Sequence, residues 1–245
     1  MMKLYDETIR EWLQLTEQKS GNQRKEYGYC PFSSLWPDSG DHNMVLRSEM
    51  AYELGGGALP ALGGTAVTEN AELVPADMIE LIGPDLQEIR SDTPYARLAL
   101  IRVKADTLGE GENTYQAIRK MEYVRYHMNP EGFMIRISAL HEQECVRVSK
   151  KALQKGLTFE KTGNLFLEAW HRIPNTAAVR LIFITDPQFP YSELKASVHR
   201  ADLITDGIDH IMKNLVMDCS VCRQKPLCDE VEGMRELHFA EAARF

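Results

Sequence analysis

The sequence predicts a mixed fold, α+β or α/β, in which helices pack on a mixed sheet and a small cysteine-rich, metal-binding segment follows at the C-terminal end. Three observations predict it. Short stretches with alternating or continuous apolar residues are typical of strands. Longer stretches repeat apolar residues every three or four positions, as helices do. Cys219, Cys222 and Cys228 then lie within ten residues of one another.

The composition is that of an ordinary soluble globular protein. The chain has 245 residues, of which 44% are hydrophobic and 26% are charged, and its formal net charge is −8. An acidic balance argues against a general nucleic-acid-binding surface. No apolar run approaches the roughly 18 residues of a membrane span, and the N-terminal residues do not read as a signal peptide. We therefore expect a cytoplasmic protein.

The predicted helices have clear apolar faces and, in places, recognisable ends. Ser149 is expected to cap a short helix that Gly156 ends, and a later helix leads directly to Cys219. The five predicted helices span residues 3–19, 112–128, 150–155, 162–173 and 200–218.

The predicted strands are shorter and carry more β-branched residues. They span residues 77–83, 97–105, 132–138, 144–149 and 177–185. Residues 20–43 contain many turn formers and are expected to form an extended loop that includes Cys30. The glycine-rich residues 55–64 are also expected to form a turn, because they fit no phosphate-binding pattern.

The three C-terminal cysteines predict a metal site more readily than free thiols. Cys219 and Cys222 are spaced C-x-x-C, which lets both sulfurs point to one metal, and Cys228 adds a third ligand. Structural zinc would need a fourth ligand such as His238. An iron–sulfur cluster would prefer a fourth thiolate, for which Cys30, followed by a proline, is the best candidate. Spacing alone leaves both metals open.

Cys145, the fifth cysteine, lies within a predicted strand. Its position predicts an inert, buried thiol rather than a ligand.

Four stretches occur in an order that is more specific than any one of them. They are "MAYELGGG" (50–57), "IELIGPDL" (79–86), "RISALHEQECVRVSKKALQKGL" (136–157) and "AAVRLIFITD" (177–186). With them, the sequence resembles the middle domain of CO-methylating acetyl-CoA synthase, the beta subunit of the CO dehydrogenase/acetyl-CoA synthase complex. The resemblance covers roughly residues 49–228. It implies an N-terminal extension at 1–48, a middle-domain-like part at 49–190, and a helix with the cysteine-rich segment at 191–245.

The resemblance also implies a cofactor. In the family, the C-x-x-C begins the site of an iron–sulfur cubane that is joined to a pair of nickel-type sites. By resemblance, Cys219, Cys222 and Cys228 are cubane ligands, which favours a [4Fe-4S] cluster over zinc. The family's later Cys-Gly-Cys, which holds the distal nickel, has no counterpart in this sequence. A nickel site is therefore not expected.

A coenzyme A site is a further expectation, since the family's middle domain is thought to help bind this molecule. Cations could bind its phosphates, and an indole could stack on its adenine. The candidates are Arg119, Arg125, Arg147, Lys150, Lys151 and Trp170. The alternative is that the cations lie on solvated faces and that the tryptophan is partly buried.

We expect an accessory or electron-transfer component of anaerobic one-carbon metabolism, with a redox, corrinoid or CO dehydrogenase-type protein as partner. Two alternatives stay open. One is a truncated acetyl-CoA synthase, an acyltransferase, that acts with another chain. The other is a zinc-stapled binding module.

Overall fold

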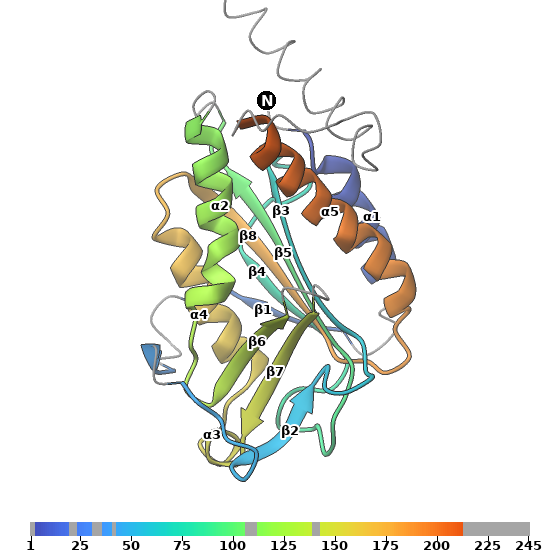
Figure 1. Ribbon diagram of the computed structural model, residues 1–245, viewed down its shortest axis with the longest axis vertical. Helices are drawn as coiled ribbons and strands as arrows, with labels where there is room; N and C mark the ends of the chain where they lie inside the picture. The colour runs from blue at the N-terminus through green and yellow to red at the C-terminus, as the bar shows by residue number, and fades with distance from the viewer. Residues whose placement is uncertain are drawn as a thin grey trace, which may run out of the picture.

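The computed structural model describes residues 3–19, 24–30, 36–40, 43–105, 112–138 and 143–212. Its centre is a five-stranded mixed sheet in the order β1-β4-β8-β5-β3 (Figure 1). Two neighbouring pairs, β4 with β8 and β5 with β3, are parallel, and the other two pairs are antiparallel. The strands are β1 (Arg24–Gly28), β3 (Ala61–Thr68), β4 (Met78–Ile82), β5 (Tyr95–Val103) and β8 (Thr176–Ile184).

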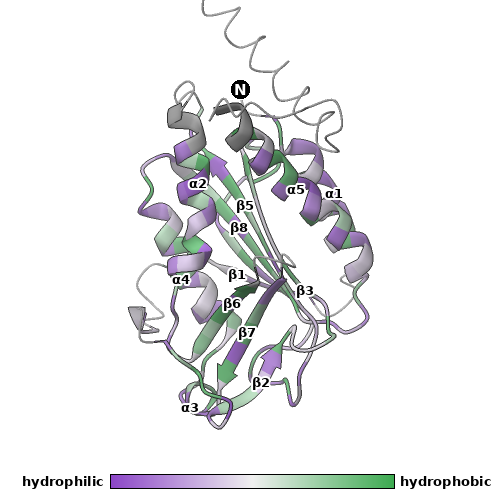
Figure 2. Cartoon of the chain, viewed as in Figure 1, coloured by the Kyte–Doolittle hydropathy of each residue, from purple (hydrophilic) through white to green (hydrophobic). Residues whose placement is uncertain are grey.

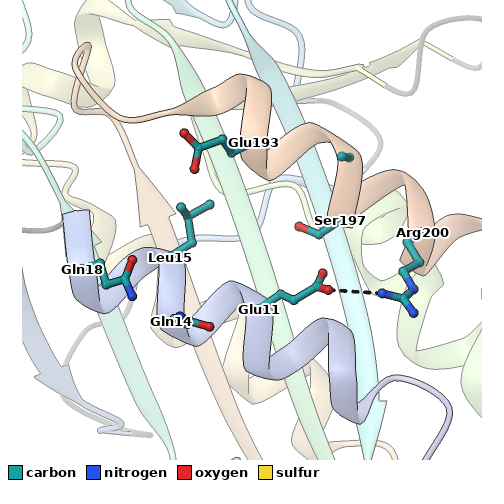
Figure 3. A pocket seen from close by; sticks show the side chains of 8 residues that line it. Glu11, Gln14, Leu15, Gln18, Glu193, Ser197 and Arg200 are labelled. Atoms are coloured by element: carbon teal, nitrogen blue, oxygen red, sulfur yellow. Dashed lines mark hydrogen bonds and ion pairs between the residues drawn. The ribbon is translucent and has the colours of Figure 1, made fainter.

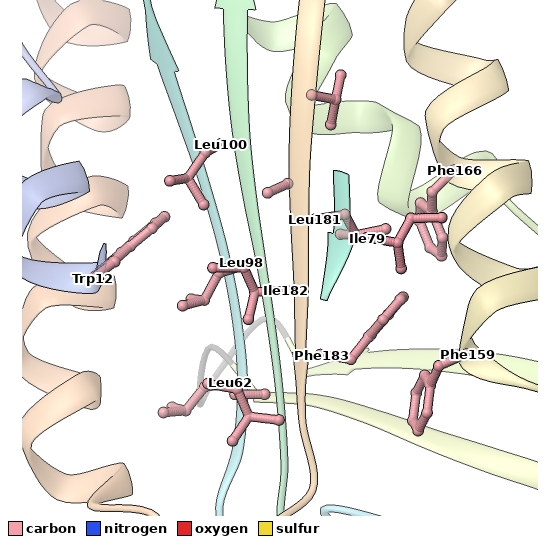
Figure 4. Packing of buried hydrophobic residues seen from close by; sticks show 14 of the residues in the cluster. Trp12, Leu62, Ile79, Leu98, Leu100, Phe159, Phe166, Leu181, Ile182 and Phe183 are labelled. Atoms are coloured by element: carbon pink, nitrogen blue, oxygen red, sulfur yellow. The ribbon is translucent and has the colours of Figure 1, made fainter. Parts of the chain in front are cut away.

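Helices cover both faces of this sheet. On one face lie α1 (Asp6–Lys19) and α5 (Tyr191–Met212), and on the other lie α2 (Glu112–His127) and α4 (Phe159–His171). Figure 4 shows Trp12 of α1 on the side of Leu98, and Phe159 of α4 on the side of Phe183. The rings of Phe159 and Phe183 have their centroids 4.6 Å apart. The predicted mixed sheet with packed helices is confirmed.

A second, smaller sheet lies against one end of the first. It is antiparallel, in the order β2-β7-β6, and consists of β2 (Met50–Leu54), β6 (Phe133–Ser138) and β7 (Gln143–Ser149). The short helix α3 (Lys150–Gln154) follows β7 directly. The central strands β5 and β8 are mostly apolar, whereas β7 and the helices mix apolar with hydrophilic residues (Figure 2). Burial of the strand side chains is the main stabilising contribution here.

A fully buried ion pair joins the two sheets. The Arg97 guanidinium of β5 donates from Nε and Nη2 to the two carboxylate oxygens of Glu144 in β7, at 2.6 and 2.7 Å. Their side chains are 0% and 1% exposed. Gly63 of β3 leaves room for this pair, because a Cβ there would lie 2.2 Å from a Glu144 oxygen. Burial opposes the charge on Arg97, but attraction to Glu144 outweighs it and raises the pKa of the guanidinium.

The I-G-P-D stretch fixes the start of α4. Gly83 has φ +108°, and a Cβ there would lie 2.4 Å from the backbone nitrogen of Asp186, so only glycine fits. The carboxylate of Asp85 then accepts hydrogen bonds from the N–H groups of Leu86, at 2.6 Å, and Phe159, at 3.0 Å. The second bond satisfies one of the otherwise unpaired N–H groups in the first turn of α4.

Several predicted ends are confirmed. The side chain of Ser149 accepts a hydrogen bond from the N–H of Ala152, and Gly156 has φ +82° just past α3. Helix α2 and the strands β4, β5, β6, β7 and β8 lie within two residues of their predicted ends where the structure describes them.

Helices α1 and α4 each begin three residues away from their predicted starts, and three other predicted segments differ more from the structure. Residues 24–28 form an edge strand and not part of a loop, since their polar side chains suit the exposed edge of a sheet. Within the glycine-rich stretch, residues 61–64 belong to β3, where glycines admit Glu144 and Trp12. Helix α5 starts at Tyr191, earlier than the predicted residue 200, and is described as far as Met212.

None of the helices in the described part of the chain is both long enough and apolar enough to cross a lipid bilayer.

We predict that Glu144→Ala destabilises the protein by about 3 to 5 kcal/mol, because it leaves the Arg97 charge buried without a partner. Urea unfolding measures this difference. The control is Glu168→Ala, which breaks an exposed pair with Arg172 and should cost no more than about 0.5 kcal/mol. Equal losses in the two variants would show that the buried pair does not hold the sheets together.

We predict that Asp85→Asn becomes more stable relative to the wild type as the pH rises. Burial raises the pKa of Asp85 above its ordinary value of 3.8, although its two backbone hydrogen bonds act in the opposite direction. A raised pKa means that the folded chain holds this proton more tightly than the unfolded chain does. The stability from this group is therefore full below the unfolded pKa and is lost as the pH rises through the folded pKa. Asparagine does not titrate.

Urea unfolding of both proteins from about pH 4 to about pH 7 tests this prediction. Asp92→Asn is the control, because it changes an exposed aspartate that accepts a hydrogen bond from the backbone N–H of Glu53. A difference between Asp85→Asn and the wild type that stays constant with pH would contradict the prediction.

Candidate functional site

Cys30 lies just after the edge strand β1, on the side of the sheet that α4 covers. Its thiol is exposed, and its backbone N–H donates to the side-chain oxygen of Asn164 in α4, at 2.8 Å. The neighbouring Tyr29 stacks on His171 with ring centroids 5.1 Å apart. His171 in turn bonds to Asp77 at 2.9 Å. Contacts with α4 therefore fix the backbone at Cys30 and leave its sulfur accessible.

The side-chain contacts around Cys30 were not predicted from the sequence. The three side chains Tyr29, His171 and Asp77 are far apart along the chain, and Asp77 also accepts a hydrogen bond from the N–H of Val179 at 2.8 Å. The one sequence feature that could have indicated these contacts is the aspartate directly before β4, because a short acidic side chain at that position can accept a hydrogen bond from the neighbouring strand.

The other predicted metal ligands, Cys219, Cys222, Cys228 and the alternative His238, lie outside the described residues. Within the described residues, no three His, Cys, Asp or Glu side chains gather closely enough to hold a metal ion. Helix α5 packs on β3, α1 and α2, whereas Cys30 contacts α4. The ligand set therefore stays a prediction.

Cys145 is half-buried in β7, and its Sγ donates to the carbonyl oxygen of Gly55 at 3.1 Å. Burial and the nearby Glu53 carboxylate raise the pKa of this thiol. It is therefore mostly protonated and weakly nucleophilic, as predicted for an inert cysteine.

The two predicted coenzyme A ligands on α2 already have protein partners. Arg119 and Arg125 both bond to the carboxylate of Glu122, at 2.8 and 2.9 Å. Each guanidinium also lies over a tyrosine ring, Tyr123 at 4.6 Å and Tyr126 at 5.0 Å from the ring centroids. Arg125 further donates to the carbonyl oxygen of Gly63 at 3.3 Å. These cations stabilise the packing of α2.

The other predicted cations lie on β7 and α3. Arg147 bonds to Glu53 at 3.1 Å, and Lys150 reaches the carbonyl oxygen of Ser48 at 3.4 Å. Lys150 and Lys151 are exposed. Of the six predicted coenzyme A residues, these two keep the most accessible charges.

Trp170 lies in the core. It is 0% exposed, and its indole N–H donates to the carbonyl oxygen of Met121 at 2.8 Å. Phe166 stacks on it, with centroids 5.5 Å apart. A buried indole offers no face to a ligand that arrives from solvent, so we do not include it in a coenzyme A site.

The family model described as CO dehydrogenase/acetyl-CoA synthase complex beta subunit matches residues 40–188. The chain belongs to this family. The match contains both sheets except β1, and it includes the I-G-P-D stretch and β7 with its buried Glu144. No curated protein matches the chain.

The family match does not reach the predicted metal ligands. Cys30 precedes the matched residues, and Cys219, Cys222 and Cys228 follow them. Membership in the acetyl-CoA synthase beta-subunit family therefore rests on the sheet core, and each ligand needs its own test.

We predict that iodoacetamide alkylates Cys30 at least about fivefold faster than Cys145 in the folded, metal-free protein, because Cys30 is exposed, whereas Cys145 is half-buried and its pKa is raised. Peptide mass spectrometry after short exposure measures both rates. Equal rates in urea are the control. Faster labelling of Cys145 in the folded protein would contradict the structure, and protection of Cys30 after metal loading would support its role as a ligand.

Proposed function

We propose that this chain is an acetyl-CoA synthase-like iron–sulfur protein of CO/acetyl-CoA metabolism. In this proposal Cys219, Cys222 and Cys228 hold one [4Fe-4S] cluster, and the chain acts as an accessory or electron-transfer component. The observation that carries the proposal is the combination of the family match at residues 40–188 with a C-x-x-C-x5-C run shortly after α5.

The chemistry of the donor set suits this cofactor. Thiolates are the preferred ligands of iron–sulfur clusters, and three of them lie within ten residues. Zinc also accepts thiolates, but it usually occupies a closed site of four ligands that contribute nitrogen or sulfur. When bound, a cluster supplies one-electron transfer. The chain would supply the thiolates and the surface that a redox partner meets.

Cys30 is the proposed fourth ligand. Its exposed thiol is available, and its backbone is bonded to α4, so a metal there would connect the cysteine run to the sheet core. His238 is the alternative and would favour zinc.

The sequence supports no nickel pair in residues 1–245, because these residues contain no Cys-Gly-Cys. We propose electron transfer, not acetyl transfer, as the role of the cysteine run in these residues. The family is named for a complex, so we propose a CO dehydrogenase-type protein as the partner.

We predict about four irons and four sulfides per chain in protein produced and purified without oxygen, together with a brown colour. Cys219→Ser, Cys222→Ser and Cys228→Ser should each lose most of the iron. Cys145→Ser is the matched control and should keep it. Metal analysis and the absorption spectrum measure the result.

A colourless protein with one zinc per chain would instead support the zinc-stapled module. Stoichiometric nickel with CO-dependent acetyl transfer beside a partner chain would support the truncated synthase. Comparing Cys30→Ser with His238→Ala identifies the fourth ligand, since only the true ligand's variant should lose metal.

A further inference from the structure

A surface groove of about 500 Å³ lies between α1 and α5 (Figure 3). Both helices lie outside the residues that match the family. The groove is lined by Glu11, Gln14, Leu15 and Gln18 of α1, and by Glu193, Ala196, Ser197 and Arg200 of α5.

The spacing of the lining residues is the same on both helices. Each helix contributes positions i, i+3, i+4 and i+7, which form one continuous face over two turns. The helices run in opposite directions, because Tyr5 bonds to Thr205 and Trp12 bonds to Ser197. Two such rows side by side make a trough that can accept a third helix, whose own i, i+3, i+4 and i+7 side chains would fit between them.

The chemistry of the groove indicates the charge of its occupant. Arg200 already bonds to Glu7 at 2.7 Å and to Glu11 at 3.2 Å, so its charge is matched within the protein. The carboxylate of Glu193 has no ion-pair partner among the described residues. Leu15 and Ala196 provide an apolar strip between the polar side chains.

We propose that this groove docks a basic amphipathic helix of a partner protein. Small apolar side chains of that helix would cover Leu15 and Ala196, and a lysine or arginine would pair with Glu193. The overall charge of −8 favours a basic partner in the same way. The proposal uses none of the predicted metal ligands, so it stands or falls independently of the iron–sulfur assignment.

The test places the photo-crosslinker p-benzoylphenylalanine at Gln14 of the full chain, in the cells that naturally produce it. Mass spectrometry then reads the sequence of the crosslinked partner peptide. We expect a peptide with lysine or arginine on one face of an amphipathic helix. Glu193→Lys should reduce its yield about fivefold, the effect of reversing one charge at an interface. Ala196→Trp, which fills the trough without changing its charge, should reduce it similarly.

Glu72→Lys, an exposed charge reversal elsewhere, is the matched control and should leave the yield unchanged. The same crosslinker at Gln154, on α3, gives the background. Thermal melting of each variant establishes that it is folded. The proposal is overturned if Gln14 crosslinks no more than Gln154 does, if the crosslinked peptide comes from a second copy of this chain or is acidic, or if Glu193→Lys has no effect.

Discussion

The arrangement of the two sheets depends on one buried ion pair. A guanidinium and a carboxylate that are both removed from water carry a large desolvation cost, and only close, paired hydrogen bonds offset it. Arg97 and Glu144 meet this condition with two bonds, one from each of two guanidinium nitrogens. Since one partner belongs to β5 and the other to β7, the pair allows little sliding of one sheet on the other. An apolar contact would be less directional and would tolerate more registers.

The surroundings of this pair explain features of several other elements. Position 63 requires a glycine, because a Cβ there would collide with the Glu144 carboxylate. The carbonyl oxygen of the same glycine accepts a hydrogen bond from Arg125 of α2. Arg97 also lies 5.8 Å from the ring centroid of Phe166 in α4. Helices α2 and α4 therefore both contact the region around this ion pair, where the two sheets are joined. The arginine on α2 that looked like a phosphate ligand is part of this packing.

Local patterns predicted most of the fold, because alternation, caps and glycine stops are properties of neighbouring residues. The cap at Ser149 and the buried strand β8 are examples. Elements whose character comes from distant partners were harder to predict. The polar residues of β1 form a strand because β4 lies beside them. Strand β3 contains Gly63 and Gly64 because a carboxylate and an indole approach these two positions too closely for a Cβ. At the candidate site, the sequence singles out Cys30 as a ligand, which stays a prediction, but not the side chains around it, since Tyr29, His171 and Asp77 meet only in the folded chain.

Helix α5 also sets the distance between the groove and the last described residue of the chain. From Arg200, the last groove residue on it, to Met212, where its described part ends, the helix rises about 18 Å at 1.5 Å per residue. The groove residues on α5 therefore end about 18 Å before Met212 along the helix axis. Under the two proposals, partner docking and electron exchange would use different residues of the chain: the groove residues of α1 and α5 for the first, and the cysteine run for the second.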